Sequence, residues 1–261
     1  MRSIISQVFF YRTRKGLAVS KTRLPEQKKE TFIVIMPALN EVEYIEETIL
    51  YWVSILSKFP GSVILVVDKS TDGTKDKLIK LRKKYGLLKV IEQKGVGHGN
   101  ALIHGYNIAV RANHPWIVQV DSDGLFSSSD FNKLLEKKSQ SNFIIGHRQN
   151  REDPSYRIFL TWLISTWILI LFGHKIKDPN IPFRLIKRDY LEKLLNSVPN
   201  SVFAPNIFLS ILAARDGQNL NHVPVIYKTG KKKSSLSKLK LLKASLLGFK
   251  ELVDFRQNFY Q

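Results

Sequence analysis

The sequence predicts an α/β protein built on a mostly parallel sheet that helices cover on both faces. Short apolar runs alternate with segments of helical periodicity, the runs are continuously apolar, and polar clusters follow several of them. Continuous apolar runs are typical of strands buried on both faces, as in parallel sheets. The chain has 261 residues, 44% of them hydrophobic, which suffices for one large domain of this kind.

The first predicted elements follow one another in regular order. Residues 32–37 (FIVIMP) are interpreted as a buried strand that a proline ends. Asn40, with Glu43 three residues later, predicts the N-cap of a helix that runs to about Leu56. The next segments are predicted as a strand at 62–68, a basic helix at 74–85, a strand at 88–93, a glycine-rich turn and helix to 112, and a strand at 116–121.

Beyond residue 124 the pattern is less regular. A helix is predicted at 131–138, strands at 142–148 and 222–227, and a terminal amphipathic helix at 236–255. The apolar stretch Ile158–Gly173 is short for a membrane span, which needs about 20 apolar residues. It is interpreted as a core helix, a helix in contact with the membrane interface or a lipid, or a span. Its two tryptophans and the basic clusters nearby favour membrane contact.

Charge divides the chain into three parts. Residues 1–30 carry eight Lys/Arg and two Glu and are predicted as a basic arm, either solvated or laid on a membrane surface. Residues 31–230 are predicted as the folded domain and 231–261 as a basic amphipathic tail. The net charge of +19 indicates an anionic partner: nucleic acid, an acidic membrane or a phosphorylated small molecule. The absence of cysteine excludes disulfides and thiol chemistry and fits a reducing cytoplasmic setting.

Polar clusters at 37–41, 68–72 and 121–123 follow predicted strands and are expected to converge on one crevice. Asp121 and Asp123 lie two residues apart, so in an extended chain they point to the same side. Carboxylates this close repel unless a cation or a shared proton lies between them. Mg²⁺ or Mn²⁺ joined to substrate phosphates would satisfy the pair, as would a solvated turn that caps the next element. His147, His174 and His222 have no metal-ligand spacing and are interpreted as surface or hydrogen-bonded residues.

Four stretches, in this order, resemble glycosyltransferase family 2, which has the GT-A fold. They are IMPALNE (Ile35–Glu41), VVDKSTDGT (Val66–Thr74), KGVGHGNALIHGYNIA (Lys94–Ala109) and VDSDG (Val120–Gly124). Within the family the chain is most similar to the polyprenyl-phosphate sugar transferases, the dolichol-phosphate mannosyltransferase-like group. That similarity rests on IGHR (Ile145–Arg148), Arg157 and KDPNIPFRLIKRD (Lys177–Asp189). The resemblance covers roughly residues 31–240.

The resemblance implies an inverting transfer of a sugar from a UDP- or GDP-linked donor to a polyprenyl- or dolichyl-phosphate-like acceptor, assisted by Mg²⁺ or Mn²⁺. It implies a nucleotide-sugar half at 31–125, an acceptor half at 126–230 and a helical membrane-proximal part after it. The protein would be peripheral, on the cytoplasmic face of the membrane. The implied site residues are Pro37, Leu39, Glu41, Asp68 and Ser122 around the donor, Asp121 and Asp123 at the metal and diphosphate, Arg148 and Arg157 at the acceptor phosphate, and Lys231, Lys232 and Lys233 at donor or lipid phosphates.

The chain departs from the family pattern at four positions. Lys69 follows Asp68 where a second acid is usual, and Leu125 stands where relatives carry a metal-ligating glutamine. Pro182 replaces a usual glycine, and Asn206 replaces a usual acid.

Two alternative functions follow from the sequence. A family 2 transferase acting on a glycan or other hydroxyl would need a general base, for which Asp153, Asp178 and Asp189 are the candidates. A catalytically degenerate protein that binds nucleotide sugars or nucleic acid would also use the positive charge. No nucleic-acid-binding motif is present, so no nucleic-acid partner is expected.

Overall fold

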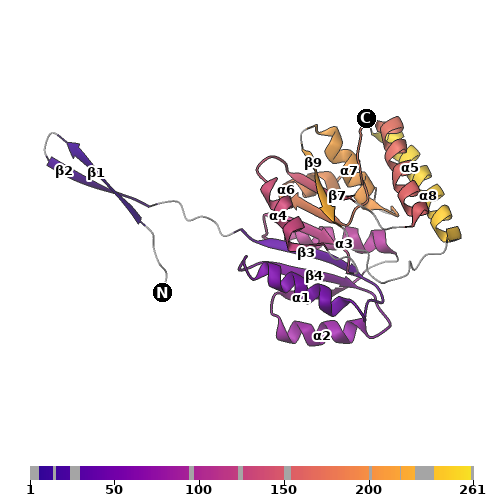
Figure 1. The fold of residues 1–261 in the computed structure, drawn as a ribbon, viewed down its shortest axis with the longest axis horizontal. Helices are drawn as coiled ribbons and strands as arrows, with labels where there is room; N and C mark the ends of the chain where they lie inside the picture. The colour runs from indigo at the N-terminus through magenta and orange to yellow at the C-terminus, as the bar shows by residue number, and fades with distance from the viewer. Residues whose placement is uncertain are drawn as a thin grey trace. The chain divides into compact units, whose positions relative to one another are not determined.

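The computed structural model describes residues 6–13, 16–23, 30–93, 97–122, 126–149, 154–199, 202–217, 219–226 and 238–259. Only the backbone is described at 6–23, 68, 128, 238–244 and 258. The chain divides into two units, residues 1–30 and 31–261. Figure 1 shows the elements of both.

The first unit contains an antiparallel hairpin within the stretch expected as a basic arm. Strand β1 (Ser6–Thr13) pairs with β2 (Gly16–Arg23), with Ser6 opposite Arg23. Sequence analysis predicted no strands here. The aromatic and β-branched residues within β1, VFFY, are the signal that favours a strand.

The second unit contains a sheet with the strand order β5-β4-β3-β6-β8-β7-β9. All strands run parallel except β8, which pairs antiparallel with both β6 and β7. The prediction of a mostly parallel sheet is confirmed. The strands are β3 (Phe32–Ala38), β4 (Val63–Asp68), β5 (Leu88–Glu92), β6 (Trp116–Val120), β7 (Phe143–Gln149), β8 (Phe183–Lys187) and β9 (Leu220–Ile226).

Helices cover both faces of the sheet, as predicted. Helix α1 packs on α2 and meets α4 through aromatic contacts, whereas α3 packs on β3, α6 and α7. Helix α5 packs along α8, where the rings of Trp167 and Phe249 lie 4.4 Å apart (Figure 1). The helices are α1 (Ile45–Leu56), α2 (Thr74–Lys84), α3 (His98–Arg111), α4 (Ser128–Glu136), α5 (Ser155–Phe172), α6 (Arg188–Leu195), α7 (Pro205–Arg215) and α8 (Lys238–Asn258).

An aromatic cluster joins the sheet to α1 and α4. Phe131 of α4 is 1% exposed, and its ring meets Phe32 of β3, Trp52 of α1 and Phe59 edge-on at centroid distances of 5.7, 5.4 and 6.3 Å. Edge-to-face pairs add to the hydrophobic free energy of burial. This cluster therefore fixes α1 and α4 side by side on the central strands.

Replacing Phe131 tests that cluster. We expect Phe131→Ala to lower the free energy of unfolding by about 3–5 kcal/mol, because the change leaves a cavity among three rings. Urea denaturation measures it. Phe159→Ala is the matched control, since Phe159 is 56% exposed on α5, and should change stability by no more than about 0.5 kcal/mol. Equal effects would contradict this packing.

Candidate active site

The loop after β3 is bound to the loop after β4. The backbone N–H of Asn40 donates to Ser70 Oγ (2.8 Å), and Asn40 Oδ1 accepts from the backbone N–H of Thr71 (2.9 Å). Asn40 has a φ of 57°, a left-handed conformation that asparagine adopts more readily than most residues. The predicted N-cap role of Asn40 is therefore wrong. Helix α1 begins at Ile45 without a side-chain cap, and Asn40 instead joins two strand ends.

A second set of hydrogen bonds holds the same loops. Asp72 accepts from the backbone N–H groups of Thr74 (3.0 Å) and Val42 (3.2 Å), and Thr74 Oγ1 accepts from the N–H of Glu41 (2.9 Å). Partial burial acts to raise the pKa of Asp72, but these hydrogen bonds outweigh it and hold that pKa below its usual value. The two loops thus form a braced rim at the carboxyl ends of β3 and β4.

The residues implied to contact the donor lie around this rim. Pro37 is buried within β3, Leu39 is 59% exposed, and Glu41 is 8% exposed. Asp68 ends β4 opposite Ala38, but its side chain lies outside the described residues. Among the described side chains of this group, that of Leu39 is the most exposed.

Asp121 lies beside the rim, directly after β6. Its side chain is partly exposed, and the buried Ser122 accepts through its carbonyl from Thr48 Oγ1 of α1 (2.9 Å). The sheet order reverses between β3 and β6, and such reversal points are where open α/β sheets bind ligands. The ends of β3 and β6 lie side by side, because the two strands pair in parallel, and the convergence of all three polar clusters on one crevice stays a prediction. Asp123, Leu125 and Lys231–Lys233 lie outside the described residues.

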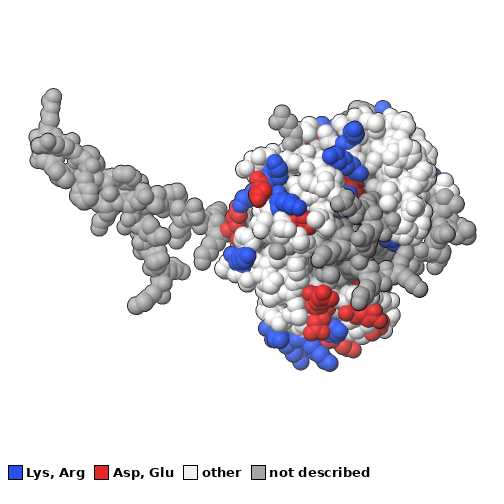
Figure 2. All heavy atoms as spheres, viewed as in Figure 1, with Lys and Arg blue, Asp and Glu red and all other residues white. Residues whose placement is uncertain are grey.

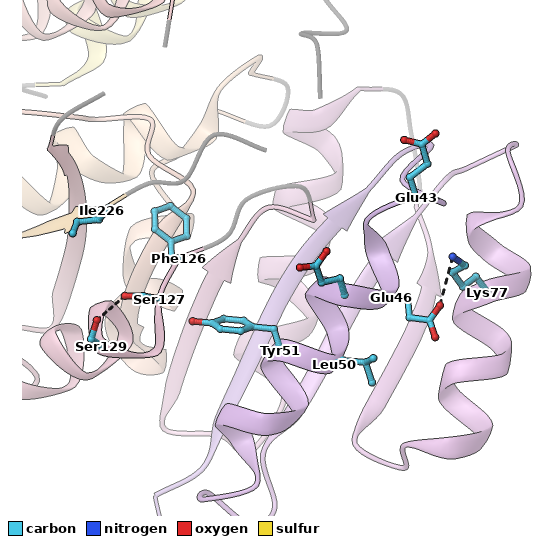
Figure 3. Close-up of a pocket in the computed structure, with 10 residues that line it drawn as sticks. Glu43, Glu46, Leu50, Tyr51, Lys77, Phe126, Ser127, Ser129 and Ile226 are labelled. Atoms are coloured by element: carbon cyan, nitrogen blue, oxygen red, sulfur yellow. Dashed lines mark hydrogen bonds and ion pairs between the residues drawn. The ribbon is translucent and has the colours of Figure 1, made fainter. Parts of the chain in front are cut away.

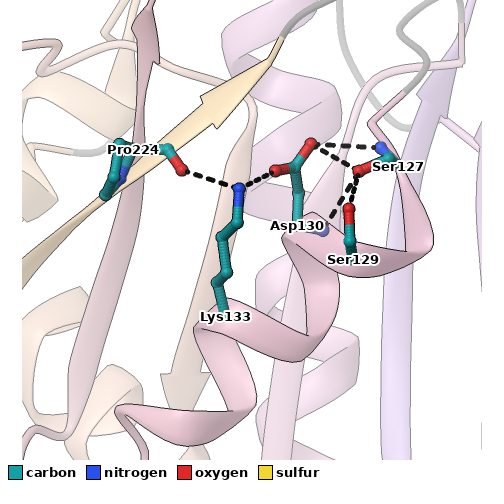
Figure 4. A network of polar contacts seen from close by, with 5 residues as sticks. All are labelled: Ser127, Ser129, Asp130, Lys133 and Pro224. Carbon is teal, nitrogen blue, oxygen red and sulfur yellow. Dashed lines mark hydrogen bonds and ion pairs between the residues drawn. The ribbon is translucent and has the colours of Figure 1, made fainter.

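A capping box fixes the start of helix α4 (Figure 4). Ser127 Oγ accepts from the N–H of Asp130 (3.1 Å), and the N–H of Ser127 donates to Asp130 Oδ2 (3.3 Å). Lys133 Nζ then donates to Asp130 Oδ1 (2.8 Å) and to the carbonyl of Pro224 at β9 (3.4 Å). The sequence did not predict this capping box, because the helix was expected to begin at residue 131, not at Ser128.

Buried side chains connect Asp121 to helices α7 and α3. Gln119 Nε2 lies 3.5 Å from Asp121 Oδ1, and Asn206 Nδ2 donates to Gln119 Oε1 (3.0 Å). The hydroxyl of Tyr106 donates to Asn206 Oδ1 (2.8 Å). Tyr106, Gln119 and Asn206 are at most 2% exposed. Asn206, one of the departures from the family pattern, is therefore a structural member of this network.

Arg184 places a buried positive charge in the same region. Its guanidinium is 0% exposed and donates to the carbonyls of Ile181, Asn206 and Pro179 and to Ser210 Oγ. Burial lowers its pKa to about 10, while Asp121 is among the groups that act to raise it. Arg184 therefore stays protonated at neutral pH. Arg184 was not among the predicted site residues. An arginine within the apolar run FRLI is nevertheless a signal of a buried charge.

The acceptor half contains a hollow of about 450 Å³ between the end of β7, α5 and the segment 175–178. Arg148 lines it and is held by Asp178 through two bonds, Nε to Oδ2 (2.8 Å) and Nη2 to Oδ1 (3.0 Å). Asp178 is 3% exposed. Arg157, the second predicted arginine, lies in the first turn of α5 and is not among the lining residues. The lining residues include Arg148, Lys175 and Lys177 as cations, and Ile158, Trp162 and Leu169 as apolar groups.

Two histidines meet on the neighbouring strands β7 and β9. The rings of His147 and His222 lie 6.4 Å apart. Nδ1 of His147 and Nε2 of His222 are buried and lack a hydrogen-bond partner among the described residues. Burial and then the charge of His147 lower the pKa of His222 to about 4. Burial also lowers the pKa of His147. Their spacing in the sequence gave no sign of this contact, because the pairing of β7 with β9 brings the two histidines together.

A wider hollow of about 930 Å³ lies between α1 and the segment 126–129 (Figure 3). Glu46 and Tyr51 line it, and Lys77 is 3.5 Å from Glu46. None of the implied donor residues that the structure describes lines this hollow. The volume of this hollow alone would place the nucleotide-binding site here. The strand ends at the sheet reversal are the better position, because ligands of open α/β sheets bind there.

The described residues fit a metal held jointly with substrate phosphates rather than an all-protein metal site. Among them, no three His, Asp or Glu side chains gather to hold an ion. Asp121 offers one carboxylate at the crevice, and Mg²⁺ typically binds one or two carboxylates plus phosphate oxygens.

A sheet that reverses at β3 and β6, with helices on both faces, is an α/β architecture of the GT-A type. The chain belongs to glycosyl transferase family 2, whose family model matches residues 33–201. The protein is therefore a glycosyltransferase.

Curated relatives and solved structures agree with this assignment. The undecaprenyl-phosphate mannosyltransferase of Micrococcus luteus is 24% identical over 75% of this chain and 82% of its own length. The polyprenol monophosphomannose synthase of Mycolicibacterium smegmatis is 26% identical over 75% of this chain and 76% of its own. Glucosyl-3-phosphoglycerate synthase from Mycobacterium tuberculosis, crystallised with Mn²⁺ and UDP-glucose, has a TM-score of 0.65 at 16% identity, covering 87% of this chain and 79% of that one.

The buried histidines predict an acid-sensitive fold. The pKa of His222 is about 4 in the folded chain and has its ordinary value, about 6.5, in the unfolded chain. Between pH 6.5 and pH 4 the unfolded chain therefore binds a proton at His222 and the folded chain does not. Stability is therefore fully present above pH 6.5 and falls as the pH drops towards 4. We expect the melting temperature of His222→Gln to fall less steeply than that of the wild type over this range. Parallel curves would contradict a buried neutral His222.

Proposed function

We propose that this glycosyltransferase moves a sugar from a nucleotide-sugar donor to a polyprenyl- or dolichyl-phosphate-like lipid. One observation carries the proposal: the hollow beside the sheet combines the cation of Arg148 with three apolar side chains of α5, those of Ile158, Trp162 and Leu169. A lipid phosphate has matching parts, a charged head and an apolar tail. The relatives named as undecaprenyl-phosphate and polyprenol transferases support the same acceptor class.

The donor is proposed to lie across the ends of β3, β4 and β6. Pro37, Leu39, Glu41 and Asp68 would contact the nucleoside, and Ser122 the ribose. The diphosphate would meet Asp121 and Asp123 with Mg²⁺ or Mn²⁺, and the bound cation would neutralise charge on the departing diphosphate. UDP is the first nucleotide to test, because a structural neighbour was crystallised with UDP-glucose.

The proposed reaction is a single displacement with inversion. An oxygen of the acceptor phosphate attacks the anomeric carbon, the new C–O bond forms, and the bond from that carbon to the diphosphate breaks. The nucleoside diphosphate leaves with the electron pair. The acceptor is already ionised at neutral pH, so no proton has to be removed. Arg148 and Arg157 would orient and neutralise the acceptor phosphate, so most of the catalysis is positioning.

The described carboxylates favour a phosphate over a hydroxyl acceptor. A hydroxyl acceptor needs a general base. Of the candidate bases, Asp178 already accepts both hydrogen bonds from Arg148, and Asp189 pairs with Arg188 at the surface. Asp153 lies outside the described residues. Activity on free glycans without lipid would favour the hydroxyl acceptor instead.

We propose a peripheral position on the cytoplasmic face of the membrane, and helix α5 supports the membrane contact. Trp162 is 60% and Ile170 is 74% exposed, and Arg157 is the one charged residue in the helix. Figure 2 shows mostly uncharged side chains over α5. By length and composition this is the one helix among the described residues that could cross a membrane. We propose that it lies at the surface, because another side of the helix packs on α8 through Trp167 and Phe249.

Turnover tests the proposed function. Purified protein with Mn²⁺, a panel of UDP- and GDP-sugars and polyprenyl phosphate should release nucleoside diphosphate and form a glycosylated lipid phosphate. We expect Asp121→Asn to lower kcat by about 10²–10³-fold, since the carboxylate proposed to hold the metal ion at the diphosphate is lost. Asp189→Asn, at an exposed carboxylate, is the control and should retain activity. If wild type and Asp121→Asn turn over equally, or neither does, the proposal is wrong.

Vesicle binding tests the membrane surface. The double change Phe159→Ser and Trp162→Ser should weaken co-sedimentation with anionic phospholipid vesicles by about tenfold or more, because two exposed aromatic side chains lose their burial in lipid. Leu50→Ser on α1, where Leu50 is 39% exposed, is the control. A loss of binding in the control as large as in the double variant would argue against α5 as the contact surface.

A further inference from the structure

A chain of hydrogen bonds runs from Tyr106 through Asn206 and Gln119 to Asp121. Only one assignment of donors and acceptors satisfies every group in it. An ionised carboxylate accepts hydrogen bonds and donates none, so Gln119 must turn its Nε2 towards Asp121. Its Oε1 then faces Asn206, which must present Nδ2, and Asn206 Oδ1 is left to accept from the hydroxyl of Tyr106. The hydrogen bonds in the structure follow this assignment.

Surrounding groups hold that assignment in place. Arg184 Nη1 donates to the backbone carbonyl of Asn206 (2.9 Å), which fixes the start of α7. Burial raises the pKa of Tyr106, so its hydroxyl stays neutral and able to donate. Gln119 lies in the middle of the sheet, where β6 pairs with β3 on one side and β8 on the other. An amide held at both ends has little freedom to turn.

We propose that Gln119, oriented by Asn206 and Tyr106, is a positioning residue that sets the Asp121 carboxylate for the donor diphosphate and its metal. The inference rests on the proposed function. The amide lies at Oδ1 of Asp121, so its position bears directly on the orientation of this carboxylate. At 3.5 Å the contact is at the long end of the range for a hydrogen bond. Hydrogen-bond partners of metal-ligating carboxylates commonly change metal affinity by 10–100-fold when removed.

If the hydrogen bonds of Tyr106, Asn206 and Gln119 only stabilised the fold, their loss would lower stability without a specific effect on Mn²⁺ binding. Buried polar side chains pair with one another in most folds, and losing one such bond lowers stability wherever it lies. Tyr190 offers the matched comparison: it is 8% exposed, and its hydroxyl donates to Asp216 (3.1 Å). Tyr190→Phe removes the same group as Tyr106→Phe, but from a bond that does not lead to Asp121.

The test measures Mn²⁺ binding to the full chain directly, by the loss of the free-ion signal in electron paramagnetic resonance, with UDP or GDP present. We expect Gln119→Leu to weaken Mn²⁺ binding by about tenfold or more and Tyr106→Phe by about threefold, with Tyr190→Phe unchanged. Melting curves by circular dichroism check that each variant is folded. Tyr106→Phe and Tyr190→Phe should lower the melting temperature similarly, so only Mn²⁺ binding separates them.

Three results would overturn the inference, and they are distinguishable. Wild-type binding of Mn²⁺ by folded Gln119→Leu would overturn the positioning role alone. If Gln119→Leu does not fold, equal Mn²⁺ binding by Tyr106→Phe and Tyr190→Phe would overturn it. Failure of the wild type itself to bind Mn²⁺ with either nucleotide would overturn the metal-assisted function and this inference with it.

Discussion

The buried guanidinium of Arg184 is the constraint on which the site depends. An arginine that is 0% exposed must find acceptors within the protein, because an unpaired buried charge is very costly. Its acceptors are the carbonyls of Pro179, Ile181 and Asn206 and the hydroxyl of Ser210. The segment before β8 and the first turn of α7 are thereby held at fixed positions beneath the crevice. A positive charge also remains below a site proposed to bind an anionic donor.

That constraint links the two halves of the proposed site. On the donor side, Arg184 donates to the backbone carbonyl of Asn206, and the side chain of Asn206 donates to Gln119, which contacts Asp121. On the acceptor side, the segment leading into β8 carries Asp178, which holds Arg148 at the hollow. A displacement reaction needs its nucleophile and its leaving group at a fixed separation. Attaching both sides to one buried cation is a simple way for this fold to achieve that.

The sequence predicted what depends on local pattern and missed what depends on distant pairing. The apolar runs of β3, β4 and β6 and the position of Asp121 were predicted because strand burial and strand ends leave a signal in the sequence. Asn40 was misread because an N-cap pattern cannot show that Ser70 and Thr71 lie within bonding distance. The meeting of His147 and His222 and the acceptors of Arg184 come from residues far apart in the chain. Strand β8 was missed because its arginine interrupts the apolar run.

The most direct test of this account is a crystal structure with UDP or GDP and Mn²⁺, using the anomalous signal of the metal to locate it. The account predicts Mn²⁺ within about 2.2 Å of an Asp121 oxygen, bridging to the diphosphate, with the nucleotide across the ends of β3 and β4. The nucleotide bound instead in the hollow between α1 and residues 126–129, with no metal at Asp121, would contradict it.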